Sequence, residues 1–358
     1  MINRENNELR YSFNNILALL IIACLVSASI SPLAFSKENK IPAESIAKDP
    51  PPIPKKYTIP EKGIAKSPQA VTQEEEIPIK NVVHLFDTKA SSPALNLPTD
   101  VAVTRNGYFI VVDSGNDRIV IFNARGKVIK TFGRNGAMPG EFNGPVGLTV
   151  DSSGTIYVAD KDNNRIQVFN RDGKFIRLIK TRSGGKKVKP VDVAVSYDGK
   201  KLYITDNKGH KIVVYSSKGK YLESWGGEGV DKAKFRYPAT LDIDKDNKLY
   251  VVDVFNSRIQ ILGNEGKHIL DVGSWGVLPG QLFRPKGVEV DASGNVYVSD
   301  SYMELIQVFD AQRRFSHVIG KAGEIRRFSA PTGIAVQGNR LYVTEMLRNV
   351  VSVYRIEK

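Results

Sequence analysis

The chain has a single cysteine, Cys24, which lies in an apolar stretch near the N-terminus. One cysteine excludes a disulfide within the chain. It also leaves all later residues without a thiol nucleophile or a zinc–thiolate site. Histidine is scarce too, with four residues among 358. The sequence shows no set of residues typical of a Ser-His-Asp triad and no phosphate-binding glycine loop.

Acidic residues are outnumbered, with 38 Asp and Glu against 51 Lys and Arg, so the formal net charge is +13. Residues 1–36 are neutral and residues 37–93 carry +1, which leaves +12 on residues 94–358. The basic surface therefore belongs to the part of the chain that we expect to fold, and it favours acidic partners.

Residues 145–174 read PVGLTVDSSGTIYVADKDNNRIQVFNRDGK. After an opening proline, short apolar runs alternate with clusters of Asp, Asn, Ser and Gly, and a further apolar run follows at 175–179. Four short runs separated by turn residues predict a four-stranded antiparallel meander.

This unit recurs along the chain, at intervals of 45 to 48 residues between its opening prolines. The opening prolines are Pro98, Pro145, Pro190, Pro238, Pro285 and Pro331. A four-stranded unit repeated at this period is one blade of a propeller. We therefore expect an all-β chain whose residues 77–358 form a six-bladed β-propeller.

The repeated motifs are P-x-G/D-[VLI]-x-[VI] in the first run, Y-V-x-D in the second and N-x-R-I-x-V-F in the third. With these motifs the chain, over roughly residues 82–358, resembles the NHL-repeat family. The resemblance implies a six-bladed β-propeller that serves more often as a binding platform than as the carrier of one chemistry, because function lies in sites added to a fold.

The sixth copy ends after its third run, at residues 350–356. Its fourth strand has to come from elsewhere, because an unpaired sheet edge would otherwise remain. Residues 82–86 alternate like the fourth runs of the other copies, so we expect this N-terminal segment to complete the sixth blade.

Residues 1–36 contain an apolar stretch, 16–35, with three interpretations: a cleaved secretory signal, a lipoprotein signal that leaves a lipidated Cys24, or a retained membrane anchor. Residues 37–76 are rich in Pro, Lys and Glu, which predicts a disordered linker. All three interpretations place the propeller outside the cytoplasm. We expect an exported protein of the periplasm or cell envelope, in contact with the membrane if the segment is uncleaved or lipidated.

An acidic residue ends the second run of every copy: Asp113, Asp160, Asp206, Asp253, Asp300 and Glu345. A basic residue follows five places later in the first four copies. A carboxylate at a strand end can accept hydrogen bonds from the next turn, and a feature present in every repeat usually belongs to the scaffold. We therefore interpret these strand-end acids as structural.

A different acidic pair, Asp242 and Glu289, lies on the innermost strands of adjacent copies, where the other copies have small or neutral residues. Asp100 and Asp192 directly precede the corresponding innermost runs of the first and third copies. Metal-centred propeller enzymes, including lactonases, gather such acids at the channel, so one divalent ion such as calcium is an alternative to water-facing or paired carboxylates. Asp242, Asp244 and Asp246 resemble the start of a calcium loop, but Asn247 stands where that loop has glycine, and hairpin turn residues explain the segment without a metal.

Peptidyl-hydroxyglycine amidating lyases resemble this chain in their propeller and hold zinc with several histidines. Here His210 falls in a turn, and His84, His268 and His317 fall on predicted outer strands. Four residues so placed cannot converge on one tetrahedral metal. We exclude that activity.

The connections that precede the opening prolines gather at one mouth of a propeller. In copies three to five these blade entrances carry Lys189, Arg236, Tyr237 and Arg284 before the proline, and Lys286 directly after one. Cations beside an aromatic ring suit a protein, a peptide or an anionic polysaccharide, although a generic basic surface would look the same. Some NHL propellers of tripartite-motif proteins bind RNA on a basic face, but export makes nucleic acid an unlikely partner here. We expect a non-enzymatic binding or scaffold module without a cofactor, with a metal-dependent lyase or hydrolase at the channel as the alternative.

Overall fold

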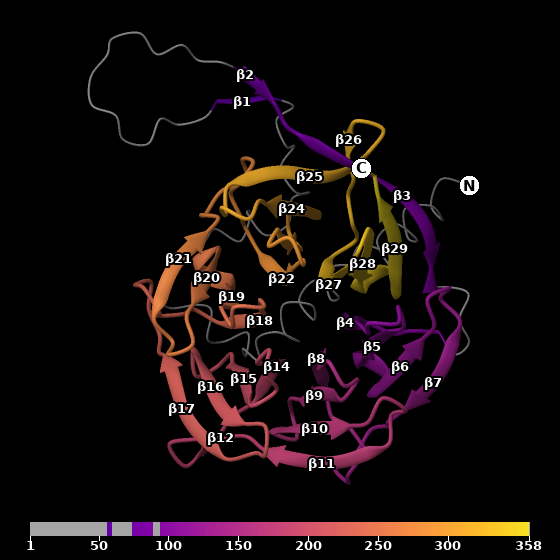
Figure 1. Cartoon of the computed structure of the whole chain (residues 1–358), viewed down its shortest axis with the longest axis vertical. Coiled ribbons are helices and arrows are strands. Elements are labelled where there is room, and N and C mark those ends of the chain that lie inside the picture. The colour runs from indigo at the N-terminus through magenta and orange to yellow at the C-terminus, as the bar shows by residue number, and fades with distance from the viewer. Residues whose placement is uncertain (1–55, 59–73, 89–93, 358) are drawn as a thin grey trace, which may run out of the picture. The chain divides into compact units, whose positions relative to one another are not determined.

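The computed structural model describes residues 56–58, 74–88 and 94–357, which consist of β-strands, turns and three short 3-10 helices. The strands are arranged around a central axis, as a propeller (Figure 1). Cys24, the apolar segment 1–36 and most of the linker 37–76 lie outside the described residues. In the part of the chain that is described, no helix is long and apolar enough to cross a membrane.

Four separate sheets each contain four antiparallel strands in chain order: β4–β7, β8–β11, β14–β17 and β18–β21. A nine-stranded sheet contains two more antiparallel runs of four, β22–β25 and β27–β28–β29–β3, together with β26. The first strands are β4 (Pro98–Val103), β8 (Pro145–Val150), β14 (Pro190–Val195), β18 (Pro238–Ile243), β22 (Pro285–Val290) and β27 (Pro331–Gln337). The second strands are β5 (Phe109–Asp113), β9 (Ile156–Asp160), β15 (Lys201–Asp206), β19 (Leu249–Asp253), β23 (Val296–Asp300) and β28 (Arg340–Glu345).

The third strands are β6 (Arg118–Phe122), β10 (Arg165–Phe169), β16 (Lys211–Ser216), β20 (Arg258–Leu262), β24 (Leu305–Phe309) and β29 (Val350–Ile356). The outermost strands are β7 (Val128–Phe132), β11 (Phe175–Lys180), β17 (Tyr221–Gly226), β21 (His268–Val272), β25 (Phe315–Lys321) and β3 (Ile79–Asp87). The short strands are β1 (Lys56–Thr58), β2 (Glu74–Glu76), β12 (Arg182–Ser183), β13 (Lys186–Lys187) and β26 (Glu324–Ile325). The 3-10 helices are η4 (Ser114–Asn116), η5 (Val254–Asn256) and η6 (Met346–Arg348). Within the predicted linker, β1 pairs with β2.

The innermost strands contact one another in a closed cycle, β4–β8–β14–β18–β22–β27–β4, and surround the centre of the view in Figure 1. Each begins at its opening proline, and all of these prolines are buried. A proline has no N–H to donate to a ladder, so the first residue of a strand is where a sheet accepts it. The prolines thus mark the starts of the strands nearest the axis.

The core lies between neighbouring sheets rather than in one central mass. One cluster joins Ile119 of β6 and Phe142 to Ile156 and Phe169 of the next sheet. The second and third strands are buried on both faces, as their continuous apolar runs predict. The outermost strands are partly exposed, as in β7.

The hairpin glycine between the third and fourth strands packs against the neighbouring sheet. Gly126 has a φ of +80°, and a Cβ there would lie 2.6 Å from the ring of Phe86. Gly173 repeats this arrangement against Phe132. The turn therefore needs glycine both for its backbone conformation and for close packing.

Strand β3 pairs antiparallel with β29, from Val82 opposite Ile356 to Asp87 opposite Ser352. The predicted pairing of residues 82–86 with the last strand is therefore confirmed. The structure adds a contact that was not predicted: Ile79–Asn81, at the start of β3, pairs in parallel with β25. One N-terminal strand thereby joins the runs β22–β25 and β27–β29.

Candidate binding face and central cavity

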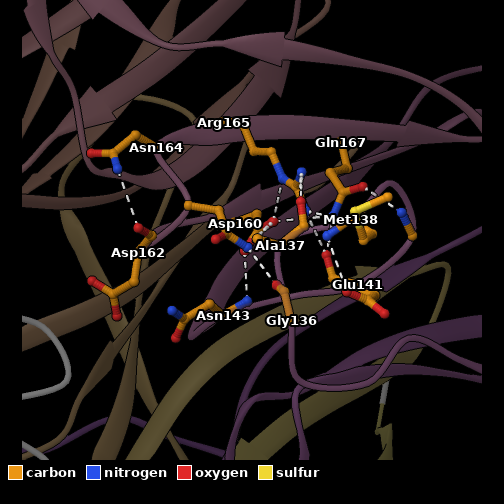
Figure 2. A network of polar contacts seen from close by, with 12 residues as sticks. Gly136, Ala137, Met138, Glu141, Asn143, Asp160, Asp162, Asn164, Arg165 and Gln167 are labelled. Atoms are coloured by element: carbon orange, nitrogen blue, oxygen red, sulfur yellow. Dashed lines mark hydrogen bonds and ion pairs between the residues drawn. The ribbon is translucent and has the colours of Figure 1, made fainter.

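The strand-end acids are buried and fully engaged by the protein. Figure 2 shows Asp160, whose Oδ2 accepts hydrogen bonds from Arg165 Nε at 2.6 Å and Gln167 Nε2 at 3.0 Å, while Oδ1 accepts from the backbone N–H of Asn143 at 2.8 Å. The side chain of Asp160 thereby fixes the connection that enters its own sheet.

The other strand-end acids repeat this arrangement with variations. Basic residues five places later bond Asp113 and Asp253, and Lys211 approaches Asp206 at 3.9 Å. Asp300 accepts backbone N–H groups instead, from Phe283 at 2.6 Å and Met303 at 3.0 Å. The interpretation of this column as scaffold is confirmed by these contacts.

A cavity of about 170 Å³ lies at the axis, among the innermost strands. Four acidic residues line it, and we call them the channel acids: Asp100 of β4, Asp192 of β14, Asp242 of β18 and Glu289 of β22. The structure thus places the predicted pair Asp242 and Glu289 in one cavity with Asp100 and Asp192. The described residues that line this cavity include no Lys, Arg or His.

Each channel acid accepts a hydrogen bond from the backbone of the next innermost strand. The donors are Leu148 N to Asp100 at 2.8 Å, Leu241 N to Asp192 at 2.9 Å, Val290 N to Asp242 at 2.7 Å and Val336 N to Glu289 at 3.2 Å. These carboxyl groups therefore link neighbouring sheets around the axis.

Burial and mutual repulsion disfavour the charged forms of these groups. Burial raises the pKa of Asp100 to about 7 and that of Asp242 to about 6. Burial raises the pKa of Asp192 well above its usual value, and the nearby Asp100 charge adds to the effect. The pKa of Glu289 is raised in the same way, by burial and then by Asp242. The cavity thus holds a substantial share of neutral carboxylic acid near pH 7.

Among the described residues, no three His, Cys, Asp or Glu side chains are arranged to hold a metal ion. In the calcium-like segment, Asp244 accepts the backbone N–H groups of Asp246 and Lys248, both at 2.9 Å. Asp151 and Asp291 make the same pair of bonds in their own hairpins. The interpretation of this segment as a hairpin turn is confirmed.

The predicted basic residues have different surroundings. Lys189 Nζ lies 2.7 Å from Asp162 Oδ1, so this cation is paired. Arg236 is exposed, and Lys286 is half-buried within β22, where its carbonyl accepts from Thr240 at 2.6 Å. Tyr237 and Arg284 instead lie among aromatic rings.

Five aromatic side chains continue from one connection to the next, and we call them the aromatic arc: Tyr237, Phe255, Trp275, Phe283 and Tyr302. Ring centroids are 5.0 Å apart for Tyr237 and Phe255, 4.3 Å for Phe283 and Tyr302, and 6.3 Å for Trp275 and Phe283. The guanidinium of Arg284 lies 4.9 Å from the ring centroid of Phe255 and 5.2 Å from that of Phe283. Arg284 therefore joins the two halves of the arc.

The arc ends at His210, whose ring meets Tyr237 at 4.6 Å in an edge-to-face contact. His210 Nδ1 also accepts the backbone N–H of Tyr237 at 3.1 Å. His84, His268 and His317 lie on β3, β21 and β25, which are outermost strands, as predicted. These histidines do not gather at one centre.

Sequence reasoning found Tyr237 and Arg284 but missed Phe255, Trp275, Phe283 and Tyr302. A signal was present: Phe255 and Tyr302 stand two places after a strand-end acid, where Gly115, Asp162 and Lys208 stand in other copies. Trp275 likewise occupies the position of Asn135 and Glu228 in similar glycine-rich connections. Comparing the copies position by position would have shown these replacements.

The NHL repeat matches the chain at residues 95–122 and 142–169. These segments cover β4–β6 and β8–β10. A search among curated proteins found no significant match.

Several solved structures are similar. Virginiamycin B lyase from Staphylococcus aureus, a catalytically inactive variant with quinupristin, is 15% identical with a TM-score of 0.53, over 73% of this chain and 80% of that one. A gluconolactonase from Xanthomonas campestris is 16% identical with a TM-score of 0.59, over 77% and 89%. A protein of unknown function from Bacteroides thetaiotaomicron is 16% identical with a TM-score of 0.59, over 78% and 75%. At these identities the likeness shows the fold alone.

Proposed function

We propose that this chain, a propeller that carries NHL repeats, is a non-enzymatic binding module that takes an acidic ligand at its aromatic arc and the neighbouring cations. The observation that carries the proposal is the seat of Arg284 between Phe255 and Phe283. Arg284 Nη1 also donates to the carbonyl of Phe283 at 3.2 Å, so the guanidinium keeps a fixed orientation, and its five N–H groups leave donors for a carboxylate. The charge of +12 on residues 94–358 favours the same class of ligand.

Binding of acidic polymers tests this proposal. Polyglutamate, an acidic polysaccharide and a single-stranded RNA are titrated against the purified chain, with Arg284→Ala and Lys286→Ala alongside. We expect at least one polymer to bind and to lose about tenfold in affinity with Arg284→Ala, a typical cost of truncating an interface arginine. If every polymer binds the variants as well as the parent, or none binds at all, the proposal is wrong.

The second candidate is a metal-dependent lyase or hydrolase with Asp242 and Glu289 at the central cavity. Four carboxyl groups line one cavity, and hard divalent ions such as calcium take oxygen ligands, but among the described residues these groups would have to move to hold an ion. The metal content of the dialysed chain separates the two candidates. One tightly held ion per chain, lost in both Asp242→Asn and Glu289→Gln, would make the enzyme the leading interpretation.

We further propose six blades, by counting β22–β25 and β27–β29 with β3 as two blades joined through the parallel pairing of β3 with β25. The closed cycle of innermost strands supports this count. Limited proteolysis tests where the propeller starts: a protected fragment beginning near residue 77 is expected, and one beginning after β3 would refute the assignment.

For residues 1–76 we propose export to the periplasm or cell envelope, followed by a linker that separates the propeller from the membrane. The apolar composition of residues 16–35 supports this assignment. Mass spectrometry of the mature protein distinguishes cleavage near residue 36, lipidation at Cys24 and retention as an anchor.

A further inference from the structure

Three connections between successive sheets share one length and one glycine pattern: residues 133–145, 226–238 and 273–285. In each, the residue two places after the first glycine forms a bridge to the connection's buried apolar residue, as Asn135 does with Phe142 and Trp275 with Leu282. The backbone therefore repeats, while the exposed side chains differ. Asn143-Gly144 of the first connection is replaced by Arg236-Tyr237 in the second and by Phe283-Arg284 in the third.

Neither the connections nor the turns beside them require aromatic residues. The same connection forms in 133–145 with polar and small residues at these positions, so the rings are not needed to fold it. Tyr237 even has a φ of +54°, in the left-handed region, where its counterpart Gly144 has +60°. A bulky side chain in that region costs backbone energy, and such outliers often occur at functional sites. Leu97 and Ala330 share this conformation, so it supports the inference without carrying it alone.

The arc also keeps apolar area in contact with solvent. Trp275 is 70% exposed and Phe255 is 37% exposed, although both belong to a chain of ring contacts. Tryptophan, tyrosine and arginine are the side chains enriched among the residues that carry most of the energy of protein–protein interfaces. We infer that the aromatic arc, with Arg284 at its centre, is the docking site of an acidic protein segment that carries apolar or aromatic side chains.

This inference rests on the proposed function and narrows its ligand to protein. Phe255 and Phe283 offer ring surface without a hydrogen-bonding group. A polysaccharide can lay only its C–H faces on these two rings, and its hydroxyls gain no hydrogen bond from them. An acidic peptide instead places a carboxylate on Arg284 and its apolar side chains on the rings on either side, so both features of the arc are matched by one partner. Two exposed cations adjoin the arc's residues in sequence, Arg236 directly before Tyr237 and Lys208 two places before His210, and add charge complementarity.

The test measures the affinity of the purified chain for a random copolymer of glutamate and tyrosine, with polyglutamate, polygalacturonate and polyuridylate compared at the same salt concentration. We expect the copolymer to bind at least about tenfold more tightly than polyglutamate. Trp275→Ala and Arg284→Ala are each expected to weaken copolymer binding by about tenfold or more, a typical loss at a binding hot spot. Polyglutamate affinity should fall with Arg284→Ala and change little with Trp275→Ala.

Two variants serve as controls. Tyr197→Ala removes a ring that is 67% exposed in the β14–β15 hairpin, outside the arc. Arg134→Ala removes an exposed arginine that pairs with Glu141. Both should keep copolymer affinity within about twofold, because neither belongs to the expected docking site.

The outcomes separate the two proposals. If polygalacturonate or polyuridylate binds through Arg284 while the copolymer binds no better than polyglutamate, the binding module stands and the protein partner is wrong. The inference is also wrong if Trp275→Ala leaves the affinity for the copolymer unchanged, or if the two control variants lower that affinity as much as Trp275→Ala does. If the parent chain binds none of these polymers, both the binding module and the protein partner are wrong.

Discussion

Asp160 and Asp192 are buried aspartates on neighbouring sheets, and the surroundings of their carboxyl groups differ. Asp160 meets the guanidinium of Arg165 at 2.6 Å, together with amide donors. Asp192 accepts the backbone N–H groups of Val193 and Leu241, and the charges that raise its pKa are those of other acids. Burial raises the pKa of both, but at Asp160 the cation opposes the rise. A charged pair thus holds the position that is acidic in every copy, and a carboxyl whose neutral form is favoured holds a position that is acidic in only some copies.

Positions that repeat in every copy and positions that do not repeat have different roles in this propeller. A residue present in every copy is bound to the scaffold by contacts that also recur, as the strand-end acids are. The channel acids and the aromatic arc instead appear in only some copies, and β3 comes from outside the copies. We therefore expect residues present in every copy to contribute most to stability, and residues present in only some copies to contribute most to function. Strand β3 is the exception, because it is not repeated and yet pairs with two strands of the fold.

Deleting residues 78–90 should have the largest effect, because it removes β3 and exposes the edges of both β25 and β29. The expected loss is comparable with the whole stability of a domain, about 5–15 kcal/mol. Urea unfolding followed by circular dichroism measures it. A cooperative transition at the parent's midpoint would show that ring closure contributes little.

Asp160→Asn should destabilise the chain by about 3–5 kcal/mol, because Arg165 would remain buried without its counter-charge. Asp192→Asn, the matched change among the channel acids, should cost about 1 kcal/mol or less, since a raised pKa means that the parent is already partly neutral there. Free energies of unfolding from urea titrations compare the two. Equal losses would remove the distinction between repeated and non-repeated acids.

Stability should rise as the pH falls from 8 to 6.5. The folded pKa of Asp100 is about 7, above its usual value of 3.8, so the folded state binds more protons in this interval. Such a group stabilises the fold fully below its unfolded pKa, and that contribution is lost as the pH rises through the folded pKa; the change is on the order of 1–2 kcal/mol. His317, whose pKa burial lowers to about 4, acts in the opposite direction below pH 6.5.

The control for this pH dependence is Asp100→Asn, which removes the titrating group while keeping its shape. Its free energy of unfolding should vary less between pH 6.5 and 8 than that of the parent. An equal slope in the variant would mean that other groups cause the dependence.

Trp275→Ala should have the smallest effect on stability, within about 0.5 kcal/mol, because the ring is mostly in solvent. Thermal unfolding by calorimetry measures it. A large loss of stability would show that the aromatic arc serves packing and belongs to the scaffold.

The sequence predicted the strands well, because each run has a period of two or is continuously apolar and ends at turn residues. It also predicted the pairing of β3, since only one segment outside the copies had the pattern of a fourth strand. The parallel contact of Ile79–Asn81 with β25 was not foreseen, because nothing in these three residues distinguishes that edge.

The candidate site was only partly predictable, because it depends on contacts between residues that are distant in sequence. Phe255 and Tyr302 are 47 positions apart in sequence, and only the folded structure places Arg284 and Phe283 between them. The joint effect of the four channel acids on their pKa values also depends on distances across the axis, which spacing along the chain does not give.

The double pairing of β3 has a consequence for the order of events during synthesis. Asp87 leaves the ribosome long before its partner Ser352. At typical rates of synthesis, the 265 positions between them take about 10–50 s. Until β25 (Phe315–Lys321) has been made, β3 has neither of its neighbouring strands, and an unpaired edge is a site of association with other chains. The ring can close only when β29 has emerged, so a chain that stops before Val350 would keep β3 without its antiparallel partner.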